Sequence, residues 1–100
     1  MNGYQLTPDA EADLEAIWNY SEQNWSADQA DTYLNGLISQ FKQLVKTPNI
    51  GRAYPVINTD LRILTIQSHL ILYVQKSETI LIVRILSGRQ NWVTLLTRLD

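Results

Sequence analysis

Residues 61–92 read LRILTIQSHLILYVQKSETILIVRILSGRQNW, and this stretch predicts the fold. Its Ile, Leu and Val residues fall into three short runs, which are separated by polar breaks at Gln67–Ser68 and Lys76–Thr79. The β-branched residues in these runs favour strands over helix. Strands joined by such short connections pair antiparallel, so we predict a three-stranded meander. The middle run, residues 69–74, is apolar almost throughout, as expected of a strand with a neighbour on each side.

Two helices are predicted before the meander. Thr7 is a typical N-cap, and the proline after it suits the first helical position, so the first helix runs from there to about Asn24. Ser26 and Gln29 form a capping box for a second helix, which carries one apolar stripe and ends before Pro48. Because the link between them is so short, the helices form an antiparallel hairpin whose apolar stripes face the sheet.

The remaining segments complete an α+β fold, written in chain order as β-α-α-β-β-β. Residues 2–6 alternate in polarity and predict a short N-terminal strand, while residues 93–99 predict a short helical tail. The connection over residues 48–60 is long for a compact domain, and we expect its Arg52 and Tyr54 to be exposed. The sheet is expected to be mainly antiparallel.

Composition excludes several classes of protein. One hundred residues make a single domain with its own core, and the absence of cysteine removes disulfides and thiolate metal sites. The apolar runs are too short to span a bilayer, so we expect a cytoplasmic protein with no membrane contact. Seven acids and no base occupy the first 31 residues, whereas eight bases and three acids follow from Lys42 onward. The net charge of −2 argues against direct nucleic-acid binding in isolation, although a local basic patch can attract an acidic partner.

Arg84 is the most unusual charged residue. Alternation from Ile80 places it on the same face as Ile82 and Leu86, where a guanidinium needs a carboxylate or several carbonyls. A structural ion pair and a role in binding both remain open. If Arg62 lies on the same face, the two arginines form a small cationic site.

Two further positions have a structural and a functional interpretation. His69 follows the Gln67–Ser68 turn, where it either bonds to the backbone or serves as an acid or base. Trp92 lies close to Arg89, which suits either a cap on the core or an interface hot spot. With one histidine, no cysteine and no phosphate-binding or catalytic motif, we predict no cofactor, no metal and no catalytic residue.

Four segments together carry a family resemblance. They are LTPDAEADLEAIWNY at 6–20, PNIGR at 48–52, SHLILYV at 68–74 and RILSGRQNW at 84–92. In this order they resemble the ParE-type toxins of the RelE/ParE toxin–antitoxin superfamily. The resemblance implies a toxin that inhibits DNA gyrase and is silenced by the C-terminal segment of a ParD-like or other antitoxin. Ser87 departs from the family, which often places histidine there.

The RelE branch of the superfamily instead cuts messenger RNA on the ribosome. That reaction needs a base, an acid and cations for the developing charge, and related ribonuclease toxins carry Tyr or His near the C-terminus. Residues 88–100 contain neither. We therefore favour a non-enzymatic gyrase poison over a ribonuclease that uses Arg62, His69 and Arg84, and over an inactive binding module. An acidic antitoxin segment is expected on the basic half, at Arg62, Arg84 and Arg89, and His69 and Trp92 are further candidates for contact with antitoxin or target.

Overall fold

The computed structural model describes residues 3–54 and 60–87 of the chain. The predicted strand, helical hairpin and meander are all present. The elements are β1 (Gly3–Leu6), α1 (Pro8–Asn24), α2 (Ala27–Lys46), β2 (Arg52–Ala53), β3 (Arg62–Ile66), β4 (His69–Lys76) and β5 (Thr79–Ser87). The two-residue strand β2 was not predicted, because so short a strand carries no periodic signal. The predicted tail at 93–99 lies outside the described residues.

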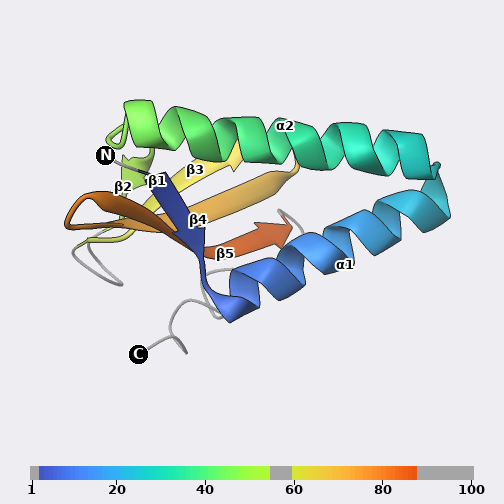
Figure 1. The fold of residues 1–100 in the computed structure, drawn as a ribbon, viewed down its shortest axis with the longest axis horizontal. Helices are drawn as coiled ribbons and strands as arrows, with labels where there is room; N and C mark the ends of the chain where they lie inside the picture. The colour runs from blue at the N-terminus through green and yellow to red at the C-terminus, as the bar shows by residue number, and fades with distance from the viewer. Residues whose placement is uncertain (1–2, 55–59, 88–100) are drawn as a thin grey trace.

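The strands form one mixed sheet in the order β1-β5-β4-β3-β2. β3, β4 and β5 make the predicted antiparallel meander, and β2 extends it antiparallel to β3. β1 pairs with β5 in parallel, which the return of the chain through the hairpin permits. Figure 1 shows α1 and α2 running antiparallel beside the sheet, with β1 entering next to β5. The prediction of a mainly antiparallel α+β fold is confirmed.

Side chains cap both helices as predicted. The hydroxyl of Thr7 accepts from the Ala10 amide at 3.1 Å and donates to the Val83 carbonyl at 2.7 Å. The hydroxyl of Ser26 accepts from the Gln29 amide at 3.1 Å. Each cap satisfies an amide that the first helical turn leaves without a partner. The cap of α1 also fixes the start of that helix to β5.

The sheet buries apolar side chains on both faces. On the helix-covered face, α1 and α2 pack against the sheet through the buried residues Ala10, Leu37, Phe41, Leu44, Ile71, Tyr73, Ile80, Ile82 and Ile85. The second cluster is formed by Leu61, Ile63, Leu72, Val74 and Leu86, and the partly buried Tyr54, Leu70, Leu81 and Val83 pack against it. The expectation that Tyr54 is exposed was therefore wrong. Its ring gains more from burying its surface in this cluster than from facing water.

A β-bulge in β5 changes which residues share a face. Leu72 pairs with Arg84 whereas Tyr73 pairs with Ile82, so β5 contains one extra residue at this point. The simple alternation expected from Ile80 to Leu86 is wrong beyond the bulge. Ile80 and Ile82 belong to the helix-covered cluster, but Leu86 belongs to the second one. A bulge shifts the side-chain phase by one residue, and one sequence gives little sign of it.

Tyr73 holds the connection after α2 against the sheet. Its buried hydroxyl donates to the Pro48 carbonyl and accepts from the Gly51 amide, each at 2.8 Å. A Cβ at Gly51 would lie 2.6 Å from this hydroxyl, so only glycine fits without a shift of the ring. Burial raises the pKa of the Tyr73 hydroxyl, which keeps its proton available for donation.

Replacing Tyr73 with Phe is expected to lower the free energy of unfolding by about 1–3 kcal/mol, because the buried Gly51 amide loses its acceptor. Urea unfolding followed by circular dichroism measures the loss. Tyr20→Phe is the control, since Tyr20 is 58% exposed. Equal midpoints for the two variants would contradict the role assigned to this hydroxyl.

Candidate functional site

Arg84 forms an ion pair with Asp13 on α1. Its Nε lies 2.7 Å from Oδ2 and its Nη2 lies 2.9 Å from Oδ1, so the pair is bidentate. The Ile85 amide also donates to Oδ2 at 2.9 Å. The hydrogen bonds that Arg84 donates to the Asp13 carboxylate raise the pKa of the guanidinium above its ordinary value. The carboxylate partner that the sequence predicted for Arg84 is thus Asp13 on α1. This ion pair fixes α1 to the bulge of β5.

Arg62 serves a different part of the structure. Its Nη1 donates to the Gly51 carbonyl at 2.7 Å and reaches the Asn49 carbonyl at 3.4 Å. It therefore stabilises the same connection that Tyr73 holds. Arg62 is thus bonded to this connection and Arg84 to α1, while the two arginines pair with the adjacent β4 residues Tyr73 and Leu72.

His69 starts β4 and is bonded to a side chain rather than to the backbone. Its Nδ1 is hydrogen-bonded to the hydroxyl of Tyr33 on α2, and the two rings are tilted by 58° with centroids 5.4 Å apart. Burial lowers the pKa of the imidazole from its ordinary value of 6.5, so the ring is neutral at pH 7. Ser87, at the position where the family often has histidine, pairs with His69 across the sheet.

Among the residues proposed for a ribonuclease reaction, His69 lies apart from the two arginines along the sheet. Arg62 pairs with Tyr73, four positions along β4 from His69, which is a separation of about 13 Å. Arg84 pairs with Leu72, three positions from His69. The described residues contain no group of three or more His, Cys, Asp or Glu side chains that could hold a metal ion. Arg89 and Trp92, the other two predicted site residues, lie outside the described residues.

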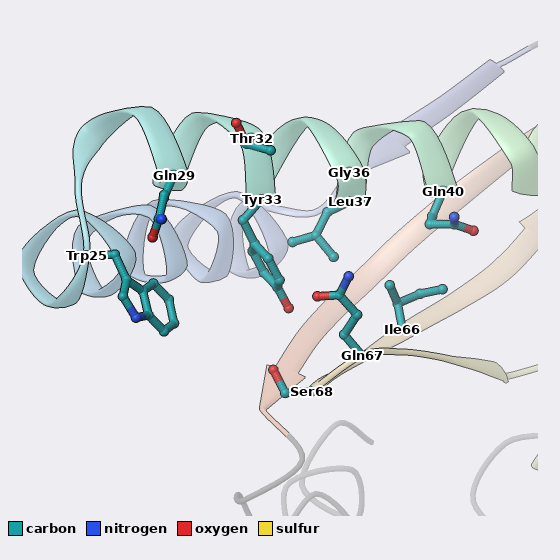
Figure 2. A pocket seen from close by; sticks show the side chains of 10 residues that line it. All are labelled: Trp25, Gln29, Thr32, Tyr33, Gly36, Leu37, Gln40, Ile66, Gln67 and Ser68. Atoms are coloured by element: carbon teal, nitrogen blue, oxygen red, sulfur yellow. The ribbon is translucent and has the colours of Figure 1, made fainter.

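A groove of about 560 Å³ lies between α2 and the β3–β4 turn, and the sequence did not predict it. Figure 2 shows side chains from α2 on one side and from the turn on the other. Its described lining residues are Trp25, Gln29, Thr32, Tyr33, Gly36, Leu37, Gln40, Ile66, Gln67 and Ser68, and none of them is charged. The signal in the sequence was the placement of Gln29, Gly36 and Gln40 along a single side of the second helix.

Trp25 stands at one end of this groove, at the junction of the two helices. It is 62% exposed, and its ring is nearly perpendicular to that of Tyr20, with centroids 6.2 Å apart. The two exposed aromatic rings thus lie together at this junction. Among the described residues, no helix is long and apolar enough to cross a membrane.

Comparison with known proteins shows the family to which this chain belongs. Residues 4–92 match the model for the ParE toxin of the type II toxin–antitoxin system parDE. The chain therefore belongs to the ParE toxin family.

Individual relatives agree with this assignment. Toxin ParE1 of Mycobacterium tuberculosis is 38% identical over 89 residues, which cover 88% of this chain and 91% of that protein. Toxin ParE1 of Caulobacter vibrioides is 31% identical over 91 residues, covering 91% and 94%. A solved structure titled as the chromosomal ParDE TA system from P. aeruginosa superposes with a TM-score of 0.74 at 25% identity, covering 85% of this chain and 94% of that one. The resemblance stated from the four sequence segments is confirmed.

Replacing Asp13 with Asn is expected to lower the free energy of unfolding by about 1.5–3 kcal/mol, because Arg84 loses a charge-assisted, bidentate partner. Arg84→Lys should lower the free energy of unfolding by a smaller amount, since lysine keeps the positive charge but cannot bond both carboxylate oxygens as the planar guanidinium does. Arg52→Lys is the matched control, as Arg52 is exposed on β2. Urea midpoints for the three variants test this order, and an Asp13→Asn protein as stable as the control would refute it.

The stability of the fold is expected to depend on the protonation of His69. Its pKa is lower in the folded chain than in the unfolded chain, so the unfolded chain takes up the proton first. The free energy of unfolding therefore falls as the pH drops below about 6.5. The substitution His69→Gln removes the contribution of this histidine to the pH dependence of stability. Unfolding curves at pH 7.5 and 5.5 should show a smaller pH effect in the variant than in the wild type, and parallel behaviour would contradict the assignment.

Proposed function

We propose that this ParE toxin acts without catalysis, by binding DNA gyrase and stalling it on cleaved DNA. The observation that supports this most is the dispersal of its few reactive side chains. The single imidazole of the chain is paired with Tyr33, and two arginines serve the connection after α2 and the Asp13 pair. A phosphoryl-transfer site needs its acid, base and cations within reach of one substrate.

An antitoxin is the second partner of this proposal. The solved relative from P. aeruginosa is titled as a ParDE system, and the basic half of this chain suits an acidic segment. Arg62, Arg84 and Arg89 are the proposed contacts, and His69 and Trp92 are further candidates for contact with antitoxin or target. The described bonds of Arg84 use two of its five N–H groups, and those of Arg62 start from Nη1 alone. Within the part of the chain that the structure describes, both guanidinium groups thus keep donors for a carboxylate while they hold the fold.

Purified toxin is expected to inhibit supercoiling by DNA gyrase and to leave cleaved DNA attached to the enzyme. Plasmid supercoiling is measured across a range of toxin concentrations, and circular dichroism confirms that the toxin is folded. Adding the antitoxin from the neighbouring gene should restore activity. Arg89→Glu should need more antitoxin for the same recovery, because it reverses a charge at the proposed contact.

Three outcomes would contradict this function. Normal supercoiling at a large molar excess of folded toxin would remove gyrase as the target. Induction in cells that produces cut messages within minutes, without a DNA-damage response, would instead indicate the ribonuclease activity of the RelE branch. A toxin that binds antitoxin but leaves growth untouched would indicate an inactive binding module, which the serine at position 87 would then help to explain.

A further inference from the structure

The groove between α2 and the β3–β4 turn has an apolar floor and a polar rim. Tyr33, Leu37 and Ile66 supply apolar surface, while Gln29, Gln40 and Gln67 surround it with amides. Because none of the described lining residues is charged, the groove has no means to neutralise a phosphate or a metal ion. An apolar floor with a few amide donors and acceptors fits a polypeptide that carries apolar side chains on one side.

Gly36 gives an independent reason to expect a partner here. It lies in the interior of α2, where glycine weakens a helix relative to most residues. Nothing lies within 4 Å of the Cβ that another residue would add, so packing inside this chain does not require glycine. The backbone at Gly36 lines the groove and is exposed. A glycine that lowers the stability of its helix, and that no contact within the chain requires, is expected where the backbone of another molecule approaches closely.

The charges near the groove indicate the chemistry of the occupant. The first 41 residues of the chain contain seven acids and no Lys or Arg. Glu22 and Asp28, three residues before and after Trp25, are both exposed. A Lys or Arg at this end of the groove gains attraction from these carboxylates and from the exposed indole face. An acidic segment, such as the one proposed for the antitoxin, would be repelled.

We propose that this groove binds an amphipathic segment of the toxin's target protein, with apolar side chains over Tyr33 and Leu37 and a Lys or Arg beside Trp25. The proposal rests on the function given above and assigns the two halves of the chain to different partners. The basic half receives the acidic antitoxin, and the groove on the acidic half receives the target. Close approach at Gly36 lets the two backbones lie together.

The variant Gly36→Gln tests the groove. Gln is a better helix former than Gly, so the melting temperature is expected to rise by about 2–4 °C. Its side chain fills the groove, so affinity for purified DNA gyrase, measured by surface plasmon resonance, should fall at least tenfold. Affinity for the purified antitoxin should stay within twofold of the wild type. Asn35→Gln is the matched control, because its neighbouring position on α2 is exposed and is not among the described lining residues.

A second variant tests the charge complementarity. Glu22→Lys combined with Asp28→Lys should weaken gyrase binding several-fold and make it less sensitive to salt, since the attraction to a basic segment is lost. The helical fold is checked by circular dichroism. Unchanged gyrase affinity in this double variant would overturn the assignment of a basic occupant.

The remaining outcomes separate this inference from the proposed function. If the wild type stalls gyrase and Gly36→Gln stalls it equally well, the groove proposal is wrong and the function stands. If Gly36→Gln loses antitoxin binding in the same proportion, the antitoxin occupies the groove and the proposal is also wrong. If the wild type neither binds nor stalls gyrase, the proposed function fails, and the assignment of the groove to that target fails with it.

Discussion

The burial of β4 on both faces is the constraint on which the rest of the structure depends. Ile71 and Tyr73 face the helices, whereas Leu72 and Val74 face the second cluster, and all four are buried. A strand of this kind must be covered on both sides, and its pairing edges must be occupied by β3 and β5. The helical hairpin supplies one cover. Its position is then fixed by polar bonds at its ends, since the apolar contacts alone have little direction.

These polar bonds explain part of the uneven charge along the chain. Asp13 lies in the acidic half and Arg84 in the basic half, and folding brings them together between α1 and β5. Arg62 makes a second internal bond, to carbonyls of the connection after α2. A few charged side chains from the two halves of the chain therefore make bonds within the molecule, namely the Asp13–Arg84 ion pair and the bond from Arg62 to the connection. Other exposed charges of the described residues, such as Glu22 on α1 and Arg52 on β2, lie on different elements, where they can steer different partners.

The elements that sequence analysis predicted correctly are those that local chemistry specifies. Thr7 and Ser26 satisfy amides within three residues of themselves, so their roles follow from the chain around them. The three strands of the meander follow from short apolar runs and polar turns. The partner of Arg84 could be expected as a carboxylate but not identified as Asp13, because 71 positions separate the two residues. The bulge opposite Leu72 and the two-residue strand β2 depend on the finished sheet, so neither has a local signal.

The groove shows why a binding surface is harder to predict than a fold. Its two sides come from α2 and from the turn between β3 and β4, which are distant in the sequence and meet only after folding. The glutamines of α2 look like an ordinary solvated face when the helix is considered alone. Gly36 is the exception, because a glycine inside a helix conflicts with local propensity wherever the helix packs. Stability of the isolated chain would favour almost any other residue at this position, so its presence is best explained by a contact that the isolated chain does not make.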